Sequence, residues 1–195
     1  MDKARIAVLV SGGGTNLQAL IDAEKSGIIK SGEIVLVCSS NANAYALTRA
    51  EKNGIETHVI ESEEDLISQL ESHDIDLIIL AGFLTILSPE VIKRYPDRII
   101  NVHPALIPSF CGKGFYGLKV HEKALEYGVK VTGATIHFVN EIPDGGKIIY
   151  QKAIDILDDD TPKTLQKRVM ENCEWILLPK AAEKVSADIV KSREN

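Results

Sequence analysis

The stretch RIAVLVSGGGTNLQALI, residues 5–21, decides the fold because its hydrophobic period changes within a few residues. Residues 5–10 form a short apolar run that predicts a buried strand, whereas Leu17, Leu20 and Ile21 recur at helical spacing. Three consecutive glycines separate the two segments. The stretch therefore predicts a strand, a tight turn and a helix.

The same alternation continues through the first hundred residues. It predicts further strands at 34–39, 56–60, 76–81 and 98–102, and further helices at 44–53, 63–72 and 89–94. Strands that alternate with helices through short connections are typical of βαβ units in a parallel sheet. The right-handed crossovers of such units place helices on both faces.

The pattern changes after residue 102. Residues 103–116, which contain prolines and glycines, predict a long loop before a helix at 118–127. Strands at 131–139 and 147–154 flank the turn-rich sequence NEIPDGG and are expected to pair antiparallel. A last helix is expected to start at Pro162 and to be interrupted at Pro179. Since we find no repeat or linker, we expect residues 1–195 to form one α/β domain with a mostly parallel sheet and a late antiparallel strand pair.

Composition narrows the class of protein. The 195 residues are 45% apolar and 26% charged, which is typical of a folded chain, and the net charge of −6 without a basic stripe argues against binding to nucleic acid. No apolar run approaches the length of a membrane span, and residues 6–10 are too short for a signal sequence. Three cysteines without a C-x-x-C spacing argue against a disulfide framework or a structural zinc. We therefore expect a cytoplasmic protein with reduced thiols, no metal and no membrane contact.

The glycine turn SGGGTN, residues 11–16, is the first candidate site. Backbone N–H groups at the start of a helix bind phosphate, although Thr15 or Asn16 could instead simply cap the helix. The dinucleotide fingerprint requires a glycine at the position of Leu17, and a Walker loop requires a Gly-Lys pair. Both are absent, so the turn favours a monophosphate ester over NAD or ATP.

Asn101 and His103 are the second candidate site. They lie at the carboxyl end of a predicted strand, where alternate residues share a face, so an amide donor and an imidazole stand side by side. Such a pair can serve an oxyanion and a proton transfer, but a capping asparagine beside a buried histidine explains it equally well. Asp144, in Asp-Gly-Gly, is a turn residue or a carboxylate that orients the imidazole.

The segment AGFLTIL, residues 81–87, follows the fourth predicted strand. Its apolar side chains can line a pocket for a flat heterocycle or be buried under the next helix. The remaining histidines have no metal-ligand spacing.

Five motifs in order, SGGGTNL, AGFLTILSP, NVHPALIPSF, VTGATIHFV and DGGKIIYQ, resemble those of the folate-dependent formyltransferases over residues 5–154. The resemblance implies a Rossmann-like sheet and 10-formyltetrahydrofolate as co-substrate, with no metal. It implies transfer of the formyl group to the amine of 5-phosphoribosylglycinamide in de novo purine biosynthesis. The expected partners are thus two small molecules.

The same resemblance assigns roles to individual residues. Asn101 is expected to donate to the oxyanion, His103 to act as general acid and base, and Asp144 to raise the pKa of His103. The residues expected to hold the phosphoribosyl substrate are Gly14, Thr15, Asn16 and, at the ribose hydroxyls, Glu174. Those expected to border the folate are Leu84, Thr85, Ile86, Leu87 and Asn101.

Other functions stay open. A formyltetrahydrofolate hydrolase uses the same chemistry with water as acceptor, but that family places an extra domain before the glycine loop. The relatives that formylate methionyl-tRNA add a C-terminal domain and need a basic surface. A non-catalytic phosphosugar-binding module needs the glycine turn without the Asn101, His103 and Asp144 set.

Overall fold

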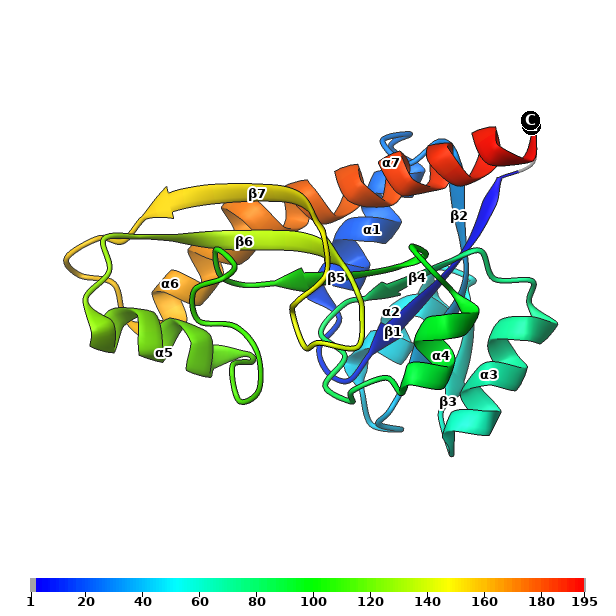
Figure 1. Ribbon diagram of the computed structural model, residues 1–195, viewed down its shortest axis with the longest axis horizontal. Coiled ribbons are helices and arrows are strands. Elements are labelled where there is room, and N and C mark those ends of the chain that lie inside the picture. The colour runs from blue at the N-terminus through cyan, green and yellow to red at the C-terminus, as the bar shows by residue number, and fades with distance from the viewer. Residues whose placement is uncertain (1–2, 195) are drawn as a thin grey trace.

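A seven-stranded sheet forms the centre of the computed structural model, which describes residues 3–194 (Figure 1). Its strand order is β3-β2-β1-β4-β5-β6-β7. The neighbours from β3 to β5 pair parallel, whereas β6 pairs antiparallel with both β5 and β7. The strands are β1 (Ala4–Val10), β2 (Gly32–Ser39), β3 (Glu56–Val59), β4 (Leu77–Leu80), β5 (Ile99–His103), β6 (Val131–Phe138) and β7 (Ile148–Asp155).

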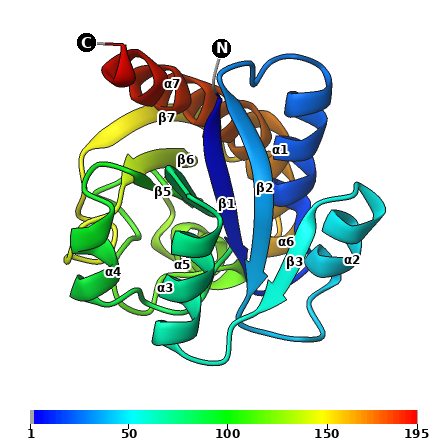
Figure 2. The same cartoon turned by 90° about the vertical axis from the view of Figure 1, so that its right-hand side faces the viewer.

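Helices cover both faces of the sheet, as the sequence predicts (Figure 2). Ile6 and Val8 of β1 belong to a core cluster shared with α1, α2 and α7, whereas Ala7 and Leu9 belong to a cluster shared with α3 and α4. This alternation follows from the period of two in a strand. The helices are α1 (Thr15–Lys25), α2 (Tyr45–Lys52), α3 (Glu63–Ser72), α4 (Pro89–Arg94), α5 (Leu118–Tyr127), α6 (Pro162–Val169) and α7 (Trp175–Arg193).

The C-terminal helix departs from the expectation. The interruption predicted at Pro179 is wrong, because α7 runs through this residue, and the irregularity is a π-helical segment, η1, at Met170–Glu174. Proline cannot donate to the carbonyl four residues before it, here that of Trp175. Trp175 has ψ −10°, well away from the helical value, which turns this carbonyl out of line. The hydrogen bond that Pro179 cannot donate is therefore missing at the junction of η1 and α7, where the helix geometry is already irregular.

Candidate active site

A cleft of about 720 Å³ lies at the carboxyl edge of the parallel strands. β1 is the point where the strand order changes direction, with β2 on one side and β4 on the other, and open α/β sheets bind ligands at such a point. The lining of the cleft includes Asn16, Asn101, His103, Asp144 and Glu174. Candidate residues from distant parts of the sequence therefore meet in one cavity.

The glycine turn precedes α1 without any side-chain cap. Gly14 is the N-cap residue with φ 71°, and a Cβ at this position would lie 2.6 Å from Cβ of Ala46. The alternative that Thr15 or Asn16 caps the helix is therefore wrong. Arg49 supports the turn by donating from Nε to the Gly13 carbonyl at 2.8 Å. The first N–H groups of α1 are thus left without a capping side chain.

Asn16 and Glu174 form a buried pair, although they are 158 positions apart. Nδ2 of Asn16 donates to Oε2 of Glu174 at 2.7 Å, while Oδ1 of Asn16 is buried and has no hydrogen-bond partner among residues 3–194. Glu174 belongs to η1 and is 6% exposed, and this burial raises its pKa to about 7. Each of the two side chains therefore retains hydrogen-bonding capacity for a polar ligand.

Asn101, His103 and Asp144 converge, as the resemblance implies. Asn101 and His103 lie on β5, and Asp144 lies in the loop between β6 and β7 with φ 55°. Oδ2 of Asp144 is 3.5 Å from Nδ1 of His103, and Oδ1 accepts from Nδ2 of Asn101 at 3.4 Å. The N–H of Gly112 also donates to Oδ2 at 2.8 Å. The carboxylate thus connects β5 to the loop that follows it.

The expected direction of the His103 pKa needs correction. His103 is only 3% exposed, and its burial lowers its pKa. The charge of Asp144 raises this pKa, as predicted, but the effect of burial is larger. The contacts of the ring act on the pKa in the opposite direction to burial. Nε2 donates to the Phe110 carbonyl at 2.8 Å, and Nδ1 faces the carboxylate of Asp144. Both neighbours are acceptors, so the contacts suit the imidazolium and the low dielectric disfavours it.

His137 is a member of the site that the sequence pattern did not reveal. Its Nε2 lies 3.2 Å from Nδ2 of Asn101 and 3.5 Å from Oδ1 of Asp144. Its Nδ1 is 2.8 Å from the Phe138 carbonyl, which only an N–H on Nδ1 can satisfy. The signal for this residue is the antiparallel register, which sets Asn101 opposite His137. The motif VTGATIHFV includes this histidine, but the pairing of β5 with β6 is what brings it beside Asn101.

His121 of α5 also lines the cleft. Neither ring nitrogen has a hydrogen-bond partner in the described part of the chain. Burial, with a smaller effect of the nearby His103, lowers the pKa of His121 to about 4. A neutral imidazole with an unpaired N–H and an unpaired acceptor is therefore placed in the cavity wall.

The segment after β4, residues 81–87, is expected either to line a pocket or to be buried under the next helix, and the structure shows both. Leu84 and Ile86 line the cleft and are 63% and 75% exposed, and Thr85 lies between them, also lining the cleft. Leu87 is 8% exposed and packs with the core cluster of α3 and α4. Two large apolar side chains at the mouth of a cavity are typical of a surface that a ligand covers.

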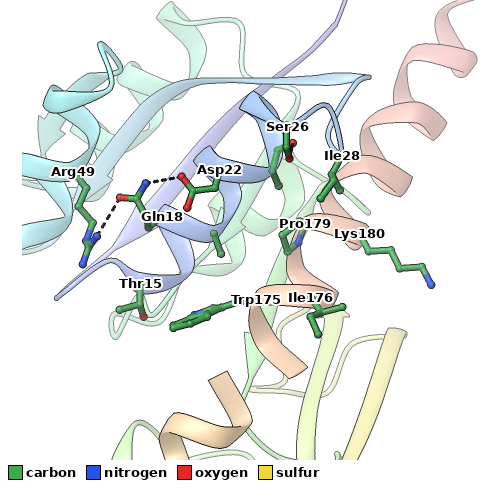
Figure 3. Close-up of a pocket in the computed structure, with 12 residues that line it drawn as sticks. Thr15, Gln18, Asp22, Ser26, Ile28, Arg49, Trp175, Ile176, Pro179 and Lys180 are labelled. Atoms are coloured by element: carbon green, nitrogen blue, oxygen red, sulfur yellow. Dashed lines mark hydrogen bonds between the residues drawn. The ribbon is translucent and has the colours of Figure 1, made fainter. Parts of the chain in front are cut away.

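A second hollow of about 790 Å³ lies between α1 and α7 (Figure 3). Its polar side is the chain of hydrogen bonds from Arg49 through Gln18 to Asp22, and its apolar side is formed by α7 residues beginning with Trp175 (Figure 3). The hollow and the cleft are adjacent, because Trp175 follows Glu174 directly in sequence. In residues 3–194 no helix is long and apolar enough to cross a membrane, and no cluster of three potential metal ligands occurs.

Known proteins share both the sequence and the fold. A sequence model described as formyl transferase matches residues 4–181. The phosphoribosylglycinamide formyltransferase of Haemophilus influenzae is 36% identical over 184 residues, which cover 90% of this chain and 84% of that protein. The human trifunctional purine biosynthetic protein adenosine-3 is 42% identical over 99% of this chain but only 19% of its own length. The crystal structure of phosphoribosylglycinamide formyltransferase from Brucella melitensis superimposes with a TM-score of 0.86 at 38% identity, covering 95% of this chain and 97% of that one.

Proposed function

Because this chain belongs to the formyl transferase family, we propose that it transfers the formyl group of 10-formyltetrahydrofolate to the amine of 5-phosphoribosylglycinamide in purine biosynthesis. The observation that carries the proposal is the convergence of Asn101, His103 and Asp144 in the same cleft as Asn16 and Glu174. A cleft of about 720 Å³ also has the size expected for a site that takes small molecules.

The two substrates enter from different sides in this proposal. The ribosyl phosphate binds the N–H groups of Gly14, Thr15 and Asn16 at the positive end of α1, and Glu174 accepts hydrogen bonds from the ribose hydroxyls. The pterin ring of the folate packs near the exposed Leu84 and Ile86, with Thr85, Leu87 and Asn101 on the same side of the cleft.

Transfer proceeds through a tetrahedral intermediate. The amine nitrogen attacks the formyl carbon, the carbonyl oxygen becomes an oxyanion, and Nδ2 of Asn101 donates to it. The bond from the formyl carbon to the folate nitrogen then breaks. The attacking amine loses one proton and the departing folate nitrogen gains one, so His103 can accept and return a proton within one turnover.

The contacts of His103 explain how the imidazole can become protonated as the reaction proceeds. Burial keeps the imidazole neutral in the free protein, and Asp144 alone does not overcome burial. A developing oxyanion adds a second negative charge beside the ring, which favours the imidazolium when it is needed. The N–H of His103 that now bonds the Phe110 carbonyl must turn to substrate, so the loop at residue 110 is expected to shift on binding.

A coupled assay tests the proposal directly. The purified protein is incubated with 10-formyltetrahydrofolate, with and without 5-phosphoribosylglycinamide, and both tetrahydrofolate and the formylated product are measured. Release that requires the glycinamide supports the transferase. Release in water alone identifies a hydrolase, and no release with either acceptor leaves a binding module.

Matched variants connect any activity with the cleft. His103→Asn is expected to lower kcat by about 10²–10⁴-fold, the usual value of general acid–base catalysis. His73→Asn, which changes a half-buried histidine at the C-terminal end of α3 that does not line the cleft, is the control and retains activity. Equal activity of the two variants would remove His103 from the mechanism.

A further inference from the structure

Lys113 is unusual among the residues around the cleft. Within residues 3–194, it is the only lysine or arginine that lines this cavity, whereas Glu141, Asp144 and Glu174 contribute carboxylates. The whole chain also carries a net charge of −6. An anionic group that enters the cleft therefore finds one cationic side chain.

A tight turn presents this side chain. The N–H of Phe115 donates to the carbonyl of Gly112 at 3.1 Å, so residues 112–115 form a β-turn with Lys113 and Gly114 at its centre. Gly114 has φ 92°, the positive value that a type II turn requires at its third position. Lys113 thus occupies the corner of the turn, and its side chain is exposed.

The turn is anchored to the proposed catalytic residues. Gly112 donates its N–H to Asp144, and the Phe110 carbonyl accepts from His103, each at 2.8 Å. Phe110 and Phe115 pack edge to face with 6.3 Å between ring centres, which closes the base of the loop. Lys113 therefore follows directly after Gly112, whose N–H is hydrogen-bonded to Asp144.

The chemistry of the co-substrate supplies a matching anion. The nitrogen that carries the formyl group lies between the pterin and a benzoyl ring, and a glutamate with two carboxylates extends from that ring. Because the glutamate lies at the opposite end of the folate from the pterin, we place it away from Leu84, beside the charged lining residues of the cleft. There it meets either Lys113 or the acidic Glu141, and charge favours Lys113.

We propose that Lys113 binds the glutamate tail of the folate and so makes the protein selective for folates that carry this tail. The proposal rests on the proposed function, because it takes the identity of the co-substrate from it. It assigns Lys113 a role in recognition and none in the transfer step.

The test compares Lys113→Met with Lys119→Met, an exposed lysine of α5 that does not line the cleft. Binding of tetrahydrofolate is measured by calorimetry, together with binding of its analogue in which methylamide replaces the glutamate. An exposed ion pair predicts a loss of about two- to fivefold in affinity for tetrahydrofolate in Lys113→Met. The loss should vanish with the methylamide, in Lys119→Met, and at 1 M salt, where the screening length falls to about 3 Å.

Steady-state kinetics provides the second measurement. Lys113→Met is expected to raise KM for 10-formyltetrahydrofolate by the same factor and to leave kcat unchanged. An unchanged affinity for tetrahydrofolate overturns the proposal, and so does a raised KM for 5-phosphoribosylglycinamide, which would assign Lys113 to the phosphate. Tail-dependent binding in a protein that transfers no formyl group would refute the proposed function and leave the role of Lys113 standing.

Discussion

Glutamine in place of Glu174 is expected to stabilise the protein at alkaline pH. Glu174 is buried, its single hydrogen-bonding partner among the described residues is Nδ2 of Asn16 at 2.7 Å, and burial raises its pKa to about 7. Glutamine keeps a carbonyl oxygen for Asn16 but has no charge to bury. Glu174→Gln therefore removes the cost of an ionised group in a dry position.

The sign and magnitude of the effect on the free energy of unfolding follow from the pKa of Glu174. The unfolded chain releases this proton near pH 4.5 and the folded protein near pH 7, so the free energy of unfolding falls as pH rises between these values. At 1.36 kcal/mol per pH unit the loss amounts to about 3 kcal/mol above pH 7. In a chain of this size, each kcal/mol changes Tm by about 2–4 °C, so we expect Glu174→Gln to raise Tm by roughly 6–12 °C at pH 8.5.

Thermal unfolding followed by circular dichroism at pH 5, 7 and 8.5 measures the effect. The gain should be small at pH 5 and largest at pH 8.5. Glu171→Gln, which changes an exposed carboxylate in the same π-helical segment, is the control and should show no gain that grows with pH. An equal gain at pH 5 and pH 8.5, or none at pH 8.5, would refute the reasoning from burial.

Two further changes have defined outcomes. Gly14→Ala is expected to cost about 1–3 kcal/mol of stability, because its φ is 71° and the new Cβ would meet Ala46, whereas Gly12→Ala, which meets nothing within 4 Å, should leave Tm nearly unchanged in the same melting experiment. Asp144→Asn removes the charge that raises the pKa of His103, so this pKa, followed by NMR, and the acidic limb of activity, where the neutral imidazole is lost, should both move to lower pH. An unmoved His103 titration would contradict the pairing.

The fold could be predicted almost completely from the sequence, because each element has its own local signal. The period of two in Ile6 and Val8 against Ala7 and Leu9 places strands between two layers of helices, and turn residues mark most of the boundaries. The π-helical segment could not be predicted, since it depends on how α7 packs and on where the carbonyl of Trp175 turns. Proline at 179 gave a real signal, but the irregularity lies on its N-terminal side.

The site was predictable in part, for a physical reason. Asn101 and His103 share one strand, so local spacing finds them, but His137 joins them only through the register of β5 with β6. The pKa direction of His103 was beyond a sequence argument because it depends on burial, which involves the loop that carries Phe110. The contact of Asn16 with Glu174 likewise exists only after the C-terminal helix has packed.

The π-helical segment also sets the angular phase of everything that follows it. Each residue of an α-helix advances the side chain by about 100° around the axis, and a π-turn contains one residue more than an α-turn. Leu165 and Val169 face Ala134 of β6 before the segment, and Leu178 and Ala182 enter the main core after it. Deleting one residue between 170 and 174 would rotate one apolar set by about 100° away from the sheet. The position of Glu174 in the cleft and the packing of the C-terminal helix therefore both depend on the π-helical segment. A chain with a regular α-helix in its place would lose both.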